Sequence, residues 1–145
     1  MTHTKTALVG DASGDVRAAF REVLSPLGFL TIESEDGFHL LDRLRTMSPS
    51  LIVVDLDLRG LDGTEILHFV RRNEDWMDIP VLVTSSRADD ATRRLVRQSG
   101  GTALLAKPFA RETLRDVVRA LLILDRERRS AEPDPGGRIT PAPRA

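Results

Sequence analysis

Residues 55–63 read DLDLRGLDG, which places Asp55, Asp57 and Asp62 within one short stretch. Clustered carboxylates are ligands that hard divalent cations prefer, and an aspartate can also attack a phosphoryl group as a nucleophile. Two interpretations therefore compete. The stretch is either a calcium-binding loop or the end of a buried strand that presents a reactive aspartate.

The calcium interpretation requires an oxygen ligand at the fifth position of the loop and a bidentate glutamate at the twelfth. Counted from Asp55, these positions hold Arg59 and Ile66. Neither side chain supplies a carboxylate or carbonyl oxygen. We therefore set the calcium-binding loop aside and examine the strand-end interpretation.

Three further polar residues follow short apolar runs elsewhere in the chain. Asp11 comes just after TALV, Ser85 ends VLVTS and Lys107 follows ALLA, while Asp55 itself ends LIVVD. Two carboxylates favour a cation such as Mg²⁺, and a lysine with a hydroxyl favours a phosphoryl group. An aspartate placed between them could form an acyl phosphate.

These apolar runs are typical of strands that are covered on both faces, and amphipathic helical patterns lie between them. We expect strands at residues 6–9, 29–34, 51–55, 81–85 and 103–106, with the second nearer an edge because it is half polar. Five strands alternating with five helices predict an α/β fold, a five-stranded parallel sheet with helices on both faces. Ligands bind beyond the carboxyl ends of such strands, where the four polar residues should meet.

The whole-chain properties exclude several classes of function. The 145 residues suffice for one domain, and the net charge of −1 gives no field that would attract nucleic acid or an anionic membrane. The chain has no cysteine, and its N-terminus has neither a signal peptide nor a membrane span. We therefore expect a cytoplasmic protein that binds neither nucleic acid nor membrane.

The composition changes near the C-terminus, where SAEPDPGGRITPAPRA is rich in proline and glycine. Such a segment buries too little apolar surface to offset its conformational entropy. We predict one domain over residues 1–126 and a flexible C-terminal tail over residues 127–145.

In the motifs ALVGDAS, LIVVDLDLRGLDGTEIL, IPVLVTSS and AKPF, which occur in this order, the chain resembles the receiver domain of two-component response regulators. The resemblance runs from about Lys5 to Leu122. It implies a flavodoxin-like (βα)5 fold with strand order 2-1-3-4-5, and a signalling module that is not an enzyme. It further implies that a histidine kinase or phosphotransfer protein donates a phosphoryl group to Asp55 with the help of magnesium.

The resemblance also assigns the other site residues. Asp11, Asp55 and Asp57 belong to the metal site, the last through its backbone carbonyl. Ser85 and Lys107 contact the phosphoryl group, and Ser85 is also a switch position. The Lys107–Pro108 bond is often cis in the family.

The sequence departs from the family pattern at four positions. Ala12 replaces the second acid that normally follows the first strand, so we expect weakened Mg²⁺ binding. The Asp57 carboxylate is unusual and either binds the metal or repels the incoming phosphoryl group. Arg59 replaces a common proline, and Leu104 replaces the aromatic residue at the second switch position.

The last helical pattern includes VVRALLIL, which is apolar on more than one face. Excess apolar surface indicates a partner, and the family often associates through its fourth helix, fifth strand and fifth helix. We therefore expect a stand-alone receiver whose phosphorylation switches this face, for a downstream protein partner or for a homodimer.

Two other functions compete with the switch. A phosphorylation-independent adaptor is favoured by Ala12 and Leu104 and opposed by Asp55, Ser85 and Lys107. A flavin carrier is disfavoured because Asp11 and Asp15 would repel the flavin phosphate and because aromatic residues are few.

Overall fold

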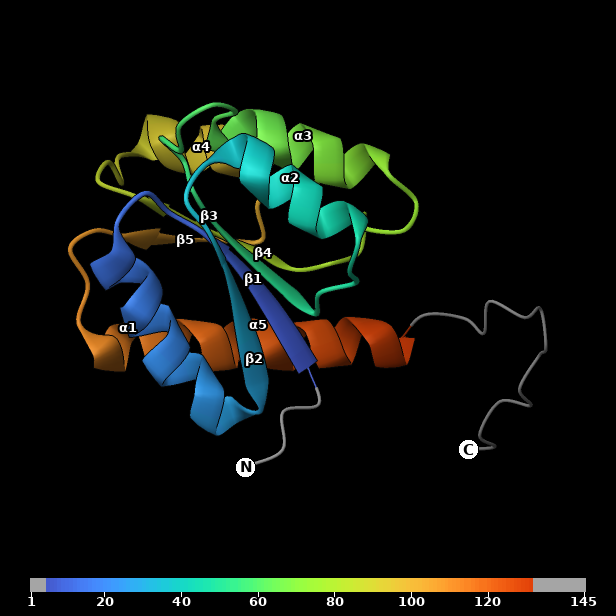
Figure 1. The fold of residues 1–145 in the computed structure, drawn as a ribbon. Coiled ribbons are helices and arrows are strands. Elements are labelled where there is room, and N and C mark those ends of the chain that lie inside the picture. The colour runs from blue at the N-terminus through green and yellow to red at the C-terminus, as the bar shows by residue number, and fades with distance from the viewer. Residues whose placement is uncertain (1–4, 132–145) are drawn as a thin grey trace, which may run out of the picture.

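The computed structural model describes residues 5–131 (Figure 1). Five strands alternate with five helices along this part of the chain. The strands are β1 Lys5–Gly10, β2 Phe29–Ser34, β3 Leu51–Asp55, β4 Val81–Ser85 and β5 Ala103–Ala106. The helices are α1 Gly14–Leu24, α2 Gly37–Arg45, α3 Gly63–Arg72, α4 Asp90–Ser99 and α5 Arg111–Ala131, with a short 3-10 helix, Ser25–Leu27, after α1.

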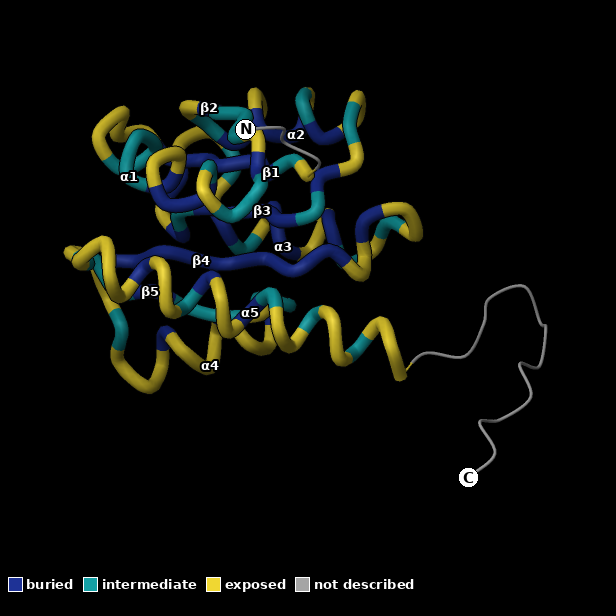
Figure 2. Tube along the Cα trace, turned by 90° about the horizontal axis from the view of Figure 1, so that it is seen from below, coloured by how far each residue is buried: buried dark blue, intermediate teal, exposed yellow. Residues whose placement is uncertain are grey.

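All strand pairs are parallel, and the strand order is β2-β1-β3-β4-β5. Helices α1 and α5 cover one face of the sheet, while α2, α3 and α4 cover the other (Figure 1). Because β1, β3 and β4 are covered on both faces, their side chains are almost wholly buried, whereas the outer sides of the helices are exposed (Figure 2). The predicted α/β fold and strand order are confirmed.

The edge position predicted for β2 is also confirmed. This strand pairs only with β1 among the described strands, and Leu30 is half exposed. A strand at the edge of a sheet is less completely buried than a central strand and tolerates the mixture of polar and apolar residues in FLTIES.

The loops at the carboxyl edge of the sheet are fixed by helix caps. The side chain of Asp62 accepts a hydrogen bond from the backbone of Glu65, and Glu65 reaches back to the Asp62 backbone, which forms a capping box at the start of α3. The backbone of Gly63 lies close to that of Leu56, since a Cβ atom at position 63 would be 2.7 Å from the Leu56 Cα. These contacts hold α3 against the loop that follows Asp55.

The last helix is longer than the sequence predicted. Residues 127–131, assigned to the tail, continue α5 to Ala131. The prolines and glycines that indicated a tail begin only after this point, and Asp125 supports the last turns through an ion pair with Arg129 at 2.9 Å. The rest of the predicted tail lies outside the described residues. Within residues 5–131, no helix has both the length and the hydrophobicity needed to cross a bilayer.

Candidate functional site

Asp11, Asp55 and Lys107 meet at the carboxyl edge of the sheet, as the strand order requires. The Lys107 Nζ donates to Asp11 Oδ2 at 2.7 Å and to Asp55 Oδ2 at 3.1 Å. The side chains are only 3%, 16% and 21% exposed for Asp11, Asp55 and Lys107. One ammonium group therefore neutralises part of the charge of two carboxylates in a sheltered position.

The environment of Lys107 determines its protonation state. Burial disfavours the charged ammonium and by itself would lower the pKa of Lys107. The hydrogen bonds and negative charges of Asp11 and Asp55 together outweigh burial, so the pKa lies above its ordinary value. Lys107 is therefore a permanent cation at neutral pH.

The Asp11 carboxylate is held from two sides. Its Oδ1 accepts a hydrogen bond from the Ser13 backbone N–H at 2.8 Å, while Oδ2 faces Lys107. The Asp11 carbonyl accepts from the guanidinium of Arg17, which also pairs with Glu33 at 2.9 Å. Arg17 thereby ties the loop after β1 to the end of β2.

The loop after β3 folds back on Asp55. Asp55 Oδ1 accepts from the Asp57 backbone N–H at 3.1 Å, and the Asp55 carbonyl accepts from the Leu58 N–H at the same distance. Leu56 and Leu58 are buried, and they anchor the loop in the core. The Asp55 side chain is thus fixed in position, with one oxygen bonded to the loop and the other to Lys107.

Ser85 is completely buried at the end of β4, and its Oγ accepts from the Arg87 backbone N–H at 3.0 Å. Its carbonyl accepts from the Lys107 N–H at 2.8 Å, so the two residues are neighbours through the backbone. The hydroxyl is engaged with the loop after β4 in this structure. Thr84 is also buried, but its hydroxyl has no hydrogen-bond partner among the described residues.

Asp57 does not bring its carboxylate to Asp11 and Asp55. Its side chain is 57% exposed, and Oδ1 accepts from Arg87 Nη2 at 3.1 Å. Within residues 5–131, no group of three or more acidic or histidine side chains is placed to hold a metal ion. Of the three predicted metal residues, only Asp11 and Asp55 bring their carboxylates together. Asp57 contacts Asp55 through its backbone N–H.

These donors fit a magnesium ion of the kind that keeps several waters. Mg²⁺ in proteins is commonly bound through one or two carboxylates, and the Asp11 and Asp55 carboxylates share a single lysine partner. Ala12 is exposed and adds no oxygen ligand from its side chain. The chemistry of the donor set is thus sufficient for magnesium but sparse.

The second predicted switch position, Leu104, is half-buried and packs against the core cluster that includes Val83 and Val96. Leu104 belongs to β5, where it pairs with Val83 of β4, and it packs on the face of the sheet that α4 covers. The peptide bond between Lys107 and Pro108 is cis.

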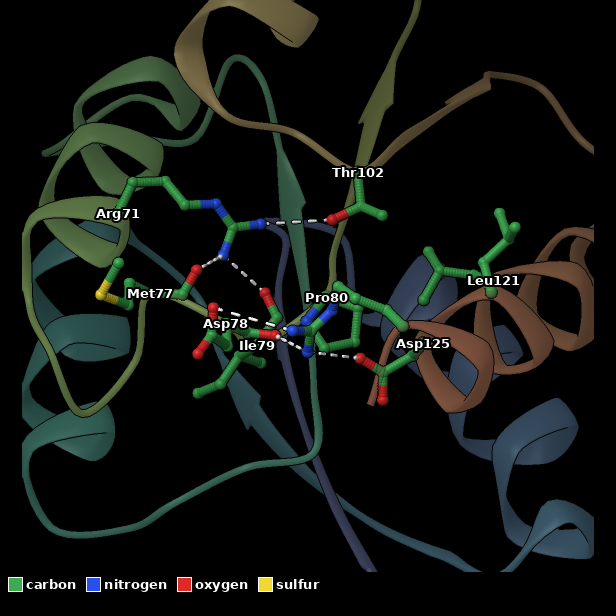
Figure 3. Close-up of a pocket in the computed structure, with 10 residues that line it drawn as sticks. Arg71, Met77, Asp78, Ile79, Pro80, Thr102, Leu121 and Asp125 are labelled. Atoms are coloured by element: carbon green, nitrogen blue, oxygen red, sulfur yellow. Dashed lines mark hydrogen bonds and ion pairs between the residues drawn. The ribbon is translucent and has the colours of Figure 1, made fainter. Parts of the chain in front are cut away.

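The pocket in Figure 3 lies at the opposite edge of the sheet, before β4 and β5, and contains none of the predicted site residues. Its main polar feature is Arg71, which donates to the carbonyls of Gly100, Met77 and Ile79 and to the Thr102 hydroxyl. These bonds join α3 to the loops before β4 and β5. This role could not be predicted from the sequence, since arginine is ordinary in the last turn of a helix.

The sequence also did not single out Arg87. Its backbone contacts Ser85 and its guanidinium contacts Asp57, which are both predicted site residues. One feature of the sequence could have indicated Arg87. It lies two residues after Ser85, just as Asp57 lies two residues after Asp55.

Comparison with known proteins gives a consistent result. The family model described as "Response regulator receiver domain" matches residues 7–119. The chain is 34% identical over 129 residues to the response regulator MprA of Mycobacterium sp. (strain KMS), covering 89% of this chain and 53% of that protein. It is 25% identical over 119 residues to the polar-differentiation response regulator DivK of Brucella ovis, covering 82% of this chain and 97% of DivK.

Among solved structures, the chemotaxis response regulator CheY4 of Vibrio cholerae superposes with a TM-score of 0.77 at 21% identity, covering 83% of this chain and 99% of CheY4. This likeness concerns the fold. The chain spans about half the length of MprA, and only 13% and 15% of two other curated relatives.

Proposed function

Because the chain belongs to the response regulator receiver domain family, we propose that Asp55 accepts a phosphoryl group from the phosphohistidine of a histidine kinase or phosphotransfer protein. Receiver domains generally act as signalling modules and generally bind magnesium. The observation that carries the assignment is the Lys107 ammonium, which lies within hydrogen-bond distance of both Asp11 and Asp55. A lysine beside a sheltered carboxylate supplies positive charge for the oxygens of a transferred phosphoryl group.

In the transfer, an Asp55 carboxylate oxygen attacks phosphorus and forms a P–O bond, while the P–N bond to the imidazole breaks. The electron pair of the broken bond stays on the imidazole nitrogen, which takes up a proton from solvent. The fixed loop holds the Asp55 oxygens in place, and Lys107 offers its charge to the phosphoryl oxygens. When bound, Mg²⁺ would be held by Asp11, Asp55 and the Asp57 carbonyl and would neutralise phosphoryl charge.

The output of the switch begins at Ser85. Its Oγ accepts a bond from the Arg87 backbone, so its own proton is available for a phosphoryl oxygen. Movement of the Ser85 hydroxyl toward Asp55 pulls on the loop that precedes α4 and shifts α4. Leu104 can then change its packing against α4. The switched surface comprises α4, β5 and α5, on which Leu95, Ile123 and Leu124 are exposed. A downstream protein or a second copy of the chain docks there.

Phosphorylation by acetyl phosphate with Mg²⁺, resolved on a phosphate-affinity gel, tests the proposal. We expect a retarded band for the wild-type protein and none for Asp55→Asn. Asp62→Asn is the matched control, because asparagine caps a helix as well as aspartate does and Asp62 lies outside the site. Absence of the wild-type band from a folded protein would exclude phosphoryl acceptance.

A phosphorylation-independent adaptor remains the second function. The outward turn of the Asp57 carboxylate and the absence of an acid at Ala12 favour it. It requires that partner binding be identical for wild-type protein treated with acetyl phosphate, untreated protein and Asp55→Asn. Binding that rises only after treatment of the wild type would exclude it.

A further inference from the structure

An ion pair that the proposed transfer does not use joins two loops next to the site. Arg87 Nη2 lies 3.1 Å from Asp57 Oδ1, and the side chains are 59% and 57% exposed. The pair joins the loop after β4 to the loop after β3, on residues 30 positions apart. It therefore bridges two loops that belong to different strands.

Both ends of the ion pair are tied to site residues by their backbones. The Asp57 N–H donates to Asp55 Oδ1 at 3.1 Å, and the Arg87 N–H donates to Ser85 Oγ at 3.0 Å. Three hydrogen bonds therefore connect Asp55 to Asp57, Asp57 to Arg87 and Arg87 to Ser85. The ion pair thus joins two loops whose backbones are bonded to the Asp55 carboxylate and to the Ser85 hydroxyl.

Phosphorylation would change the charge balance at this place. Lys107 already serves both Asp11 and Asp55, so one ammonium faces two carboxylates before any phosphoryl group arrives. A phosphoryl group on Asp55 adds negative charge two residues from Asp57, and it repels the exposed Asp57 carboxylate through solvent. Arg87 is the cation that is paired with the Asp57 carboxylate before phosphorylation.

The energetics favour an exchange of partners. An exposed arginine–carboxylate pair contributes little because solvent screens it, so leaving Asp57 costs Arg87 little. A guanidinium binds phosphoryl oxygens in a forked geometry and is well suited to that partner. We propose that Arg87 is a second phosphoryl-binding cation, held by Asp57 before phosphorylation and released to the phosphoryl group after it.

This inference rests on the proposed phosphorylation of Asp55. It adds a consequence for the switch, because the Arg87 backbone is bonded to the Ser85 hydroxyl. Movement of the guanidinium toward the phosphoryl group and movement of Ser85 therefore act on the same loop. Asp57 then opposes phosphorylation in two ways: it repels the phosphoryl group and it competes for Arg87.

The test is a double-mutant cycle on the initial rate of labelling by radioactive acetyl phosphate at saturating Mg²⁺. We expect Arg87→Ala to slow labelling about threefold to fivefold and Asp57→Asn to accelerate it by a similar factor, the scale of an exposed ion pair. The decisive comparison is Arg87→Ala in the Asp57→Asn background. There the loss should be at least as large, because Arg87 no longer has Asp57 to neutralise and acts on the phosphoryl group alone.

Arg94→Ala is the matched control, since Arg94 is exposed on α4, and it should label at the wild-type rate. Arg87→Lys should recover only part of the rate, because an ammonium keeps the charge without the fork. If Arg87→Ala has no effect once Asp57 is replaced, Arg87 only neutralises Asp57 and the inference is wrong. Asp55-dependent labelling that is insensitive to Arg87 overturns the inference alone, whereas no labelling of the wild type overturns the proposed function with it.

Discussion

Lys107 is the residue on which the electrostatics of the site depend. Its ammonium lies within 3.1 Å of two carboxylates that are nearly buried, and no other described side chain donates to either of them. Removal of one partner from a buried charged group leaves the remaining charges uncompensated. The contribution of Lys107 to stability should therefore be measurable as well as its contribution to phosphoryl transfer.

We predict that Lys107→Met lowers the free energy of unfolding by about 2 kcal/mol at neutral pH in the presence of a chelator. The raised pKa of Lys107 gives the pH dependence. The stabilisation is fully present below the ordinary value of 10.5 and is lost as pH rises through the higher value of the folded state. Urea unfolding of both proteins from pH 7 to above pH 10.5 measures the difference, which should be constant and then shrink. Equal stabilities at pH 7 would contradict the prediction.

Position 12 tests the strength of the metal site. The surface beside Ala12 also includes Glu35 and Asp36, so an aspartate at position 12 adds to negative charge already present. We predict that Ala12→Asp lowers the melting temperature without a divalent cation and that Mg²⁺ raises it more than it raises that of the wild type. Thermal unfolding with chelator and with Mg²⁺ measures both effects. Wild-type protein that binds Mg²⁺ at least as tightly as Ala12→Asp would contradict the account of a weakened site.

At the scale of elements, the loops at the two edges of the sheet are fixed by different means. At the carboxyl edge, helix caps and the Asp62–Glu65 capping box set the starts of α3 and α4. At the opposite edge, the Arg71 guanidinium binds the Gly100 carbonyl. It also binds the carbonyls of Met77 and Ile79 and the Thr102 hydroxyl (Figure 3). Burial lowers the pKa of Arg71, an effect that the Asp78 charge opposes and the Arg128 charge reinforces. Because an arginine with a lowered pKa is still charged at neutral pH, the bonds persist there.

We predict that Arg71→Lys destabilises the protein by about 2 kcal/mol, because an ammonium cannot reach the same set of acceptors and leaves partly buried carbonyls unpaired. Arg72→Lys is the matched control. Arg72 is exposed, and its guanidinium donates to the His68 carbonyl within the same helix. Chemical unfolding of both variants measures the difference. An Arg71→Lys protein as stable as Arg72→Lys would show that the set of bonds contributes little.

At the scale of the whole molecule, the sequence predicted the sheet and its helices because the buried strands are continuous apolar runs and the helices are amphipathic. It also predicted that Asp11, Asp55 and Lys107 meet, since the carboxyl ends of parallel strands share one edge. Side-chain partners between loops could not be predicted in this way. The pairs Arg87–Asp57 and Arg71–Gly100 depend on loop geometry, which has no periodicity in sequence. The tail was predicted to begin at residue 127, whereas α5 continues to Ala131. Composition indicates where a segment cannot form a packed core, but it does not mark the residue at which a helix ends.

In the proposed function, Asp55 and no other residue accepts the phosphoryl group. Borohydride reduces an aspartyl phosphate to homoserine, so treatment with acetyl phosphate and Mg²⁺, reduction, digestion and tandem mass spectrometry identify the modified position. We predict homoserine at position 55 in the wild-type protein, in an amount that falls to background when Mg²⁺ is replaced by chelator. Homoserine at position 11, 57 or 62, or none at position 55 in folded protein, would contradict the account.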